Sequence, residues 1–281
     1  MNSEENQILS IFHRLEIDSK LESVTKIYNN ESILYDGRHY NLLYENNYLE
    51  PDILVRDIPF WMDMANRYGE PILELCCGNG RISISLAEQG WQVTGIDISE
   101  SMLEEARRKC SQVEWIQADV QNFALDKQFS LIIIPFNTLG HLSDLQSIEN
   151  CLKLVRKYLQ PDGRFIIELE NYLREDNLEF LLSKTRNLYS VYEDPDGKGT
   201  VVVTYENELH LPQQIWIWKL FFQLTGQKQE IVEEIKYRLY FPKELDMLLK
   251  YNGFTIEHWF GDYDLTPFTS ESPRQILICR S

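Results

Sequence analysis

Apolar and polar positions along residues 71–171 follow two alternating patterns. Short apolar runs with the length of buried strands occur in turn at "PILELCC", "WQVTGID", "VEWIQAD", "FSLIIIPF" and "RFIIELE". Segments between them, such as "RISISLAEQG" and "SESMLEEARRKC", repeat apolar residues at helical spacing. Strands that alternate with amphipathic helices predict an α/β fold whose parallel sheet is covered by helices on both faces.

The C-terminal region continues this pattern with one change. "PKELDMLLKYNG" predicts a helix, because Pro242 stands at a first helical position and Gly253 lies just past the end. The last two strands, "FTIEHWF" and "RQILICR", are joined by a loop too short for a covering helix, so they should pair antiparallel at the sheet edge. The pattern thus predicts a doubly wound, mostly parallel seven-stranded sheet with an antiparallel C-terminal strand pair.

Two segments break the alternation. In residues 172–236, "VVVTYENELH" and "IWIWKLFF" are typical of strands, and no helix separates them, which predicts a small inserted antiparallel sheet. Residues 1–30 have helical apolar spacing, and the aromatic, acidic stretch 31–63 indicates a helix leading into a packed loop. We therefore expect an N-terminal helical segment or lid over 1–70, a ligand-binding domain from 71–171 and 237–281, and a substrate-covering insertion over 172–236.

Charge and composition narrow the classes of partner. The formal net charge of −17 argues against nucleic acids and anionic membranes, whose phosphates are bound by Lys and Arg. No apolar run approaches the roughly 18–20 residues that span a bilayer, and the N-terminus lacks the features of a signal peptide. The five cysteines show no CxxC spacing and no histidine pairing suited to a metal. These features predict a cytoplasmic protein without a metal site.

A glycine-spaced turn marks the expected ligand site. Gly78 and Gly80 stand where a parallel strand ends and a helix begins, the edge at which open α/β sheets bind ligands. Asp97 ends the next strand, where a carboxylate can accept hydrogen bonds from the ribose of a nucleoside. The third glycine of a dinucleotide fingerprint is replaced by Ser83, and Glu74 would repel a pyrophosphate. The turn therefore favours S-adenosylmethionine (SAM) over NAD.

Motifs at four successive strand ends resemble those of class I SAM-dependent methyltransferases, over residues 71–170 and 237–281. They are "ELCCGNG", in which Cys76 stands at the family's first glycine, then "GIDISESML", "QADV" and "IIIPFNTLGHL". The resemblance implies a Rossmann-like fold and a SAM site to which Glu74, Cys76, Gly78 and Gly80 belong. Its remaining implied contacts are Asp97 with the ribose, Ile98 and Met102 with the adenine, Asp119 and the Val120 amide with the adenine edge, and the Pro135 carbonyl with the methionine end. Singly, Asp97 or Asp119 could instead cap a helix or a turn.

Within this family the chain is most similar to small-molecule enzymes, including amino-sugar N,N-dimethyltransferases. That similarity implies that His141 is a catalytic base and binds substrate, and that Tyr40 of "YNLLY" walls the cofactor pocket beside the reacting groups. A histidine satisfied by nearby backbone is the alternative for His141. Glu170 and Asn171, at the end of the fifth strand, should face the cleft and bind substrate. Trp218 of the insertion is a further candidate for the substrate pocket.

The sequence thus predicts a SAM-dependent methyltransferase that methylates an amine or hydroxyl of a small molecule by direct in-line displacement. S-adenosylhomocysteine would be its product, and the protein would act as a monomer or homodimer. Two alternatives stay open, a SAM-binding module without catalysis and an NAD-dependent oxidoreductase. A nucleic-acid methyltransferase is disfavoured by the net charge and by "PFNT" after the fourth strand, where such enzymes carry an Asn/Asp-Pro-Pro-aromatic stretch.

Overall fold

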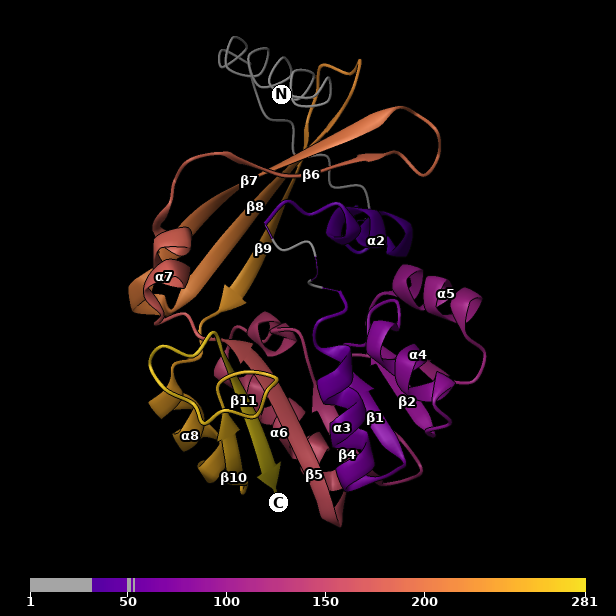
Figure 1. Cartoon of the computed structure of the whole chain (residues 1–281), viewed down its shortest axis with the longest axis vertical. Coiled ribbons are helices and arrows are strands. Elements are labelled where there is room, and N and C mark those ends of the chain that lie inside the picture. The colour runs from indigo at the N-terminus through magenta and orange to yellow at the C-terminus, as the bar shows by residue number, and fades with distance from the viewer. Residues whose placement is uncertain (1–31, 50–51, 53) are drawn as a thin grey trace.

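The computed structural model describes residues 32–49, 52 and 54–281, which form two sheets with flanking helices (Figure 1). The helices expected within residues 1–30 lie outside the described residues. The larger sheet stands below the smaller one, and the carboxyl ends of its central strands point toward the smaller sheet (Figure 1).

The larger sheet has seven strands in the order β10-β11-β5-β4-β1-β2-β3. All pairings are parallel except those of β11, which lies antiparallel between β5 and β10. This confirms the predicted mostly parallel sheet and its antiparallel C-terminal pair. The strands are β1 (Ile72–Leu75), β2 (Val93–Asp97), β3 (Glu114–Gln117), β4 (Phe129–Ile134), β5 (Leu159–Glu170), β10 (Thr255–Phe260) and β11 (Arg274–Arg280).

Helices cover both faces of this sheet. Side chains of α3 and α4 pack with Ile72 and Leu131 in one apolar core, and side chains of α6 and α8 pack with Leu73 and Ile132 in another. Successive residues of a strand point to opposite faces, so the sheet is doubly wound as predicted. The helices are α3 (Ile58–Tyr68), α4 (Arg81–Glu88), α5 (Glu100–Lys109), α6 (Leu145–Tyr158) and α8 (Pro242–Tyr251).

Helix α3 was not predicted, because the aromatic stretch that contains it suggested a packed loop. Pro59 lies in its first turn, and Trp61 and Met64 are buried against the sheet. Its anchor is Asp57, whose carboxylate accepts the Trp61 indole N–H at 3.0 Å and pairs with the Arg81 guanidinium of α4. This ion pair fixes α3 beside the turn that follows β1.

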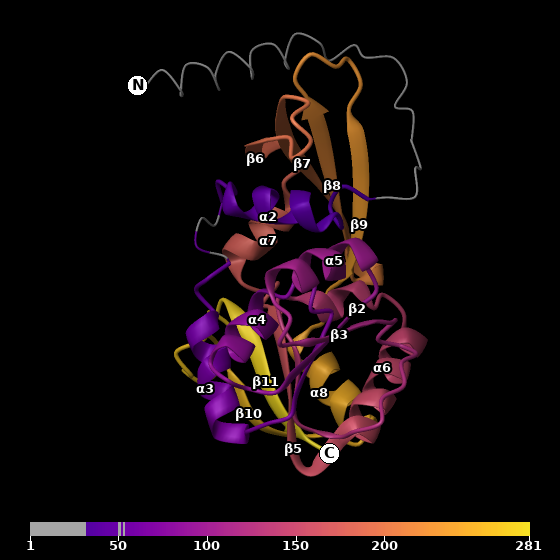
Figure 2. The same cartoon turned by 90° about the vertical axis from the view of Figure 1, so that its right-hand side faces the viewer.

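The smaller sheet is a four-stranded antiparallel meander. β7 and β8 are the two predicted strands, while β6 and β9 were not identified from the sequence. Helix α2 lies between this sheet and α5 in both views (Figures 1 and 2), and its Leu43 and Tyr44 share a core with the sheet. The elements are α2 (Gly37–Glu45), α7 (Glu175–Leu182), β6 (Asn187–Glu193), β7 (Thr200–His210), β8 (Ile215–Leu224) and β9 (Ile231–Arg238).

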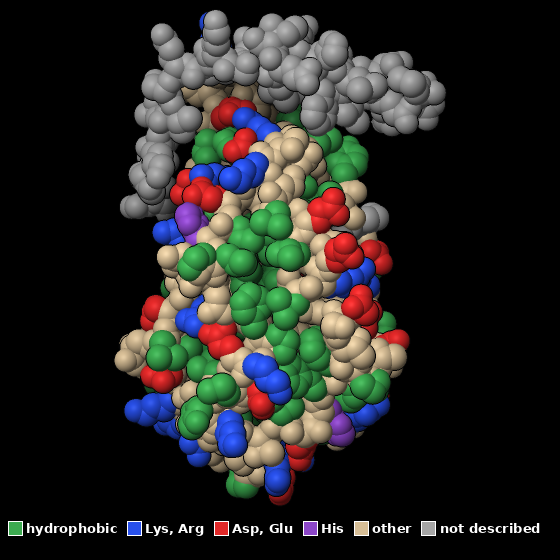
Figure 3. Space-filling model, turned by 90° about the vertical axis from the view of Figure 1, so that its left-hand side faces the viewer, with side chains coloured by type: hydrophobic (Ala, Val, Ile, Leu, Met, Phe, Trp, Pro, Cys, Tyr) green, Lys and Arg blue, Asp and Glu red, His purple; other side chains and the backbone are tan. Residues whose placement is uncertain are grey.

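The surface carries apolar residues as well as charges. Figure 3 shows apolar side chains gathered along the side of the molecule where α7 and α8 lie, with charged side chains around and among them. Large side chains exposed in these two helices are Leu182, Met247 and Tyr251. No described helix is long and apolar enough to cross a membrane.

Candidate functional site

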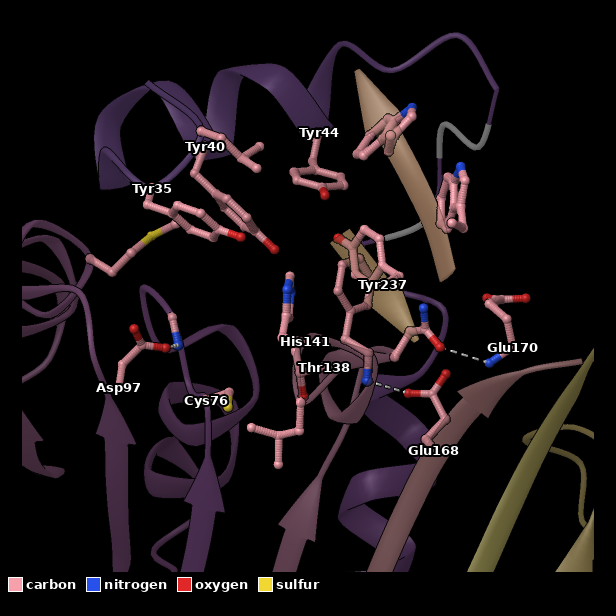
Figure 4. Close-up of a pocket in the computed structure, with 18 of the residues that line it drawn as sticks. Tyr35, Tyr40, Tyr44, Cys76, Asp97, Thr138, His141, Glu168, Glu170 and Tyr237 are labelled. Carbon is pink, nitrogen blue, oxygen red and sulfur yellow. Dashed lines mark hydrogen bonds between the residues drawn. The ribbon is translucent and has the colours of Figure 1, made fainter. Parts of the chain in front are cut away.

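A cavity of about 720 Å³ lies between the carboxyl ends of the large sheet and the inner face of the small sheet. Figure 4 shows Asp97 at the floor and Tyr40 of α2 at the roof, and Gly78 and Trp218 of β8 also line the cavity. The size is that of a small-molecule site. Because the two sheets and α2 all contribute, residues far apart in the sequence meet in this one space.

The turn after β1 has three residues in the left-handed region of backbone conformation. Gly78 and Gly80 have φ values of +55° and +86°, and Cys76 has +58° although it carries a side chain. A Cβ on Gly80 would lie 2.4 Å from Cη2 of Trp115, so only glycine fits there. Gly78 and Cys76 line the cavity, whereas Gly80 does not and serves the packing beneath the turn.

Asp97 joins β2 to this turn. One carboxylate oxygen accepts the Gly78 N–H at 2.8 Å, and the other accepts the Ser99 N–H at 2.9 Å. Burial raises the pKa of Asp97, and the backbone hydrogen bonds oppose that shift. Each oxygen has a second lone pair, so the carboxylate can still accept from a ligand in the cavity. The two interpretations of Asp97, as a backbone-capping acid and as a ligand-binding acid, are therefore compatible.

Four more predicted residues lie on the same side of the cavity. Ile98 is 67% exposed, and its large apolar side chain lines the cavity. Met102 also lines the cavity but is only 2% exposed, so it is packed into the protein. Asp119 and Val120 follow β3, and one oxygen of Asp119 accepts the Gln121 N–H at 2.9 Å. Together with Asp97 these residues combine an apolar platform with two carboxylates.

Besides Gly80, two more predicted cofactor contacts do not line the cavity. The Glu74 carboxylate is turned into the protein, where it accepts the backbone N–H and hydroxyl of Ser83, and burial raises its pKa to about 7. The Pro135 carbonyl accepts the backbone N–H and hydroxyl of Thr138 within its own turn. Both expectations of direct contact are therefore corrected, because Glu74 is buried outside the cavity lining and the Pro135 carbonyl already accepts two hydrogen bonds from Thr138.

Helix α2 contributes tyrosines to the roof. Tyr40 lines the cavity as expected, and its ring lies 4.6 Å from that of Tyr44 between centroids. The helix is fastened to the floor, since the Asn79 amide of the glycine turn donates to the Asn41 carboxamide oxygen at 2.7 Å. The Ser99 hydroxyl also donates to the Tyr35 carbonyl at 3.0 Å. These bonds hold the roof over the strand ends.

His141 enters the middle of the cavity from the 3₁₀ turn Thr138–His141 (Figure 4). Its ring lies 4.6 Å from the Tyr237 ring and 6.3 Å from the Tyr35 ring between centroids. The ring is accessible from the cavity, but the protein that surrounds it lowers its pKa to about 4. His141 is therefore neutral at pH 7 and is a weaker base than a free histidine.

On the far side of His141 the cavity is aromatic. Glu170 and Trp218 line it as predicted. Asn171 does not face the cleft, because its side chain is fully buried and donates to the carbonyls of Ser270 and Ser272 at 3.0 and 2.8 Å. It ties the loop before β11 to the end of β5, and the expectation that it binds substrate is corrected.

Glu168 is a cavity residue that the sequence analysis missed. Its carboxylate accepts the Phe136 N–H at 2.6 Å, the Tyr263 hydroxyl at 2.8 Å and the Arg274 guanidinium at 3.2 Å. These contacts position the loop that carries His141. An acid inside the apolar strand "RFIIELE" was the available signal, since a buried charge requires partners. Among the described residues, no group of three or more His, Cys, Asp or Glu side chains can hold a metal ion.

Comparisons with known proteins agree with this arrangement. Residues 72–163 match the family model described as a methyltransferase domain. A putative methyltransferase YqeM of Bacillus subtilis (strain 168) is 25% identical over 222 residues, which cover 76% of this chain and 85% of that protein. A dTDP-3-amino-3,6-dideoxy-alpha-D-glucopyranose N,N-dimethyltransferase of Streptomyces fradiae is 29% identical over 97 residues, which cover 34% of this chain and 38% of that enzyme.

A solved structure of similar fold is the sugar N-methyltransferase KedS8 from Streptoalloteichus sp ATCC 53650. It has a TM-score of 0.70 and 16% identity, with 92% of this chain and 98% of that chain covered. The CcbJ methyltransferase from Streptomyces caelestis has a TM-score of 0.67 and 22% identity, with 80% and 89% covered. The chain therefore carries a methyltransferase domain over residues 72–163 and has the Rossmann-like fold of these solved methyltransferases.

Proposed function

We propose that this protein transfers a methyl group from SAM to an amine or hydroxyl of a small molecule by direct in-line displacement. The observation that carries the proposal is that one cavity holds Asp97, Ile98 and Asp119 at one end and an aromatic chamber at the other. His141 lies between the two ends. Such a space can hold a nucleoside cofactor and a small acceptor together.

The residues at the first end fit SAM. Asp97 can accept from the ribose hydroxyls, Ile98 offers an apolar surface for the adenine, and Asp119 can accept from the adenine amino group. When bound, SAM supplies a methyl group activated by a sulfonium. Glu74 and Cys76 support the turn on which the methionine portion would rest.

The chain's own groups would align and enclose the reactants. Tyr40 and Tyr44 close the cavity from above, and exclusion of water strengthens electrostatic contacts inside. Neutral His141 can accept a hydrogen bond from the acceptor's N–H or O–H and so aim its lone pair. Because the pKa of His141 is about 4, the residue holds a proton weakly at pH 7, and the proton is released to solvent.

An NAD-dependent oxidoreductase is disfavoured at the same turn. A pyrophosphate would bind the free N–H groups at the start of α4. Here the Ser83 N–H, in the first turn of α4, already donates to the buried Glu74 carboxylate, so it is not available to a phosphate. A SAM-binding module without catalysis is disfavoured by the acceptor-sized chamber beside His141.

The wider roles also belong to the proposal. Residues 1–70 and 172–236 would cover the active site, and 71–171 with 237–281 would hold SAM. The protein would work in the cytoplasm as a monomer or homodimer, on an acceptor other than nucleic acid. The net charge of −17 supports the last point.

Calorimetric titration with S-adenosylhomocysteine, with NADH in parallel, tests the cofactor. We expect micromolar affinity for the first ligand and none for NADH. Asp97→Ala should weaken binding of S-adenosylhomocysteine at least about tenfold, the loss expected for charge-assisted hydrogen bonds. Asp63→Ala, on the surface of α3, is the matched control and should bind normally. Tighter binding of NADH, or full affinity in Asp97→Ala, would overturn the proposal.

A further inference from the structure

We propose that the methyl acceptor is a phosphate-free small molecule that carries an amine on an apolar body and binds as a cation. The inference rests on the proposed function and narrows it to N-methylation. It comes from the aromatic walls and the charge balance of the acceptor chamber, defined here by Glu170, Tyr172, Tyr189, Trp216, Trp218 and Tyr237.

The aromatic rings of this chamber form a continuous wall. Trp216 stacks on Tyr237 with 5.0 Å between centroids and lies 5.9 Å from Trp218. Tyr189 meets Trp218 edge-on at 5.0 Å. Ring faces attract ammonium groups and also cover apolar carbon. A wall of this kind suits an organic cation better than a sugar carrying a phosphate.

The charges of the cavity lining point the same way. The described lining residues include five carboxylates, those of Asp97, Asp119, Glu168, Glu170 and Asp176, but only two guanidinium groups, those of Arg56 and Arg274. Two of these carboxylates are paired, Glu168 with Arg274 and Asp176 with Arg174, which lies outside the lining. The five carboxylates still outnumber the three guanidinium groups, Arg174 included, so the net charge favours a cation over an anion.

Both guanidinium groups already have interaction partners within the protein. Arg274 donates to Glu168 at 3.2 Å and to Asp262 at 2.8 Å, and its side chain is 6% exposed. Arg56 also has an interaction partner. A nucleoside diphosphate is normally bound by several free Arg, Lys or backbone N–H donors. The Streptomyces fradiae relative is named for a dTDP-linked amino sugar, and this chamber is built for a different acceptor.

The reaction balances with such a substrate. The bound ammonium first loses one proton to solvent. The amine lone pair then forms the new N–C bond as the bond from the methyl carbon to sulfur breaks, and that bond's electron pair stays on sulfur. The positive charge passes from the sulfonium to the methylated nitrogen, so the product is again a cation in a negative chamber.

The experiment uses the full chain saturated with S-adenosylhomocysteine and three probes. Tyramine carries an aromatic ring and an ammonium, 3-(4-hydroxyphenyl)propionate carries the same ring and a carboxylate, and thymidine diphosphate carries the nucleotide anion. By calorimetry we expect tyramine to bind at least about tenfold more tightly than either anion, the effect of reversing a charge in a partly desolvated site. Equal or tighter binding of either anion, or no binding of tyramine at millimolar concentration, would refute the inference.

A charge-removing variant separates recognition from folding. Glu170→Gln keeps the shape of the side chain and should weaken tyramine binding about fivefold to tenfold, with unchanged affinity for S-adenosylhomocysteine. Asp126→Asn, which removes an exposed carboxylate outside the cavity, should change neither. Loss of S-adenosylhomocysteine binding by the wild-type protein would instead contradict the proposed function, so the two failures are distinguishable.

Discussion

The carboxylate of Asp97 accepts the Gly78 N–H at 2.8 Å, so the last residue of β2 holds the turn that follows β1. The same carboxylate lines the cavity beside the cofactor residues. A group fixed in this way loses little freedom when a ligand arrives, which is the advantage of a preorganised site. Gly78, whose N–H this carboxylate accepts, lines the cavity and should contribute to ligand binding, whereas Gly80 lies outside the lining and should contribute to stability.

Gly78→Ala and Gly80→Ala should separate binding from stability. A Cβ on Gly78 meets no atom within 4 Å, so Gly78→Ala should cost only about 1 kcal/mol of unfolding free energy, for its φ of +55°. Its methyl group would enter the cavity and should weaken S-adenosylhomocysteine binding. Gly80→Ala adds a clash with Trp115 and should cost about 3 kcal/mol.

Urea denaturation and calorimetry of both variants measure these two effects. Folded Gly80→Ala should bind S-adenosylhomocysteine nearly as wild type, because Gly80 lies outside the cavity lining. The opposite ranking, with Gly78→Ala the less stable and Gly80→Ala the weaker binder, would show that the turn has been misinterpreted.

Cys76→Gly should be tolerated or stabilising. Cys76 adopts φ of +58°, a conformation that costs a residue with a side chain about 1–2 kcal/mol. Glycine removes this strain but adds about 0.5–1 kcal/mol of backbone entropy cost. The net gain in unfolding free energy should be between zero and about 1.5 kcal/mol by urea denaturation. The neighbouring Cys77→Gly is the control, since Cys77 is buried without positive φ, and it should destabilise the protein. Equal losses in both variants would contradict the argument.

Much of the fold was predictable because its signals are local. The strands β1, β2 and β4 are apolar runs buried on both faces, and α5 is capped by Ser99, whose hydroxyl accepts the Met102 N–H at 3.3 Å. Asp97 was recognisable because an acid that ends a buried strand is unusual. These features depend on residues only a few positions apart.

The missed features depend on partners distant in sequence. In β9 the adjacent Glu233 and Glu234 interrupt the alternation of apolar and polar residues, and its pairing with β8 gives it the form of a strand. The structural role of Glu168 depends on its hydrogen bonds with Tyr263 and Arg274, which lie about 100 positions away in the sequence. The orientation of Asn171 is set by carbonyls of the loop before β11. Spacing along the chain contains no signal for such contacts.

Asp57→Ala should be severely destabilising. Asp57 is 1% exposed and pairs with Arg81, whose side chain is 19% exposed and lies 5.1 Å from the Phe136 ring centroid. Removing one partner leaves a buried charge uncompensated, a loss of about 3–5 kcal/mol. Asp63→Ala on the same helix breaks the exposed pair with Arg67 and should cost less than about 0.5 kcal/mol. Urea denaturation distinguishes the two, and similar losses would mean that the Asp57 pair is not the anchor of α3.

His141 should make stability depend on pH in one direction. The pKa of His141 is about 4 in the folded protein and 6.5 in an unperturbed histidine. Between these two pH values the unfolded chain therefore binds a proton at His141 and the folded chain does not. The wild-type protein should therefore lose stability at this site as pH falls through the window from about 6.5 to about 4, and no contribution should appear above it. His141→Gln removes the titrating group, so the variant should gain stability relative to wild type on acidification. Urea denaturation of both proteins at about pH 7.5 and about pH 5 measures the change. A constant difference between the two proteins across this window would show that the ring is protonated as readily in the folded state as in the unfolded chain.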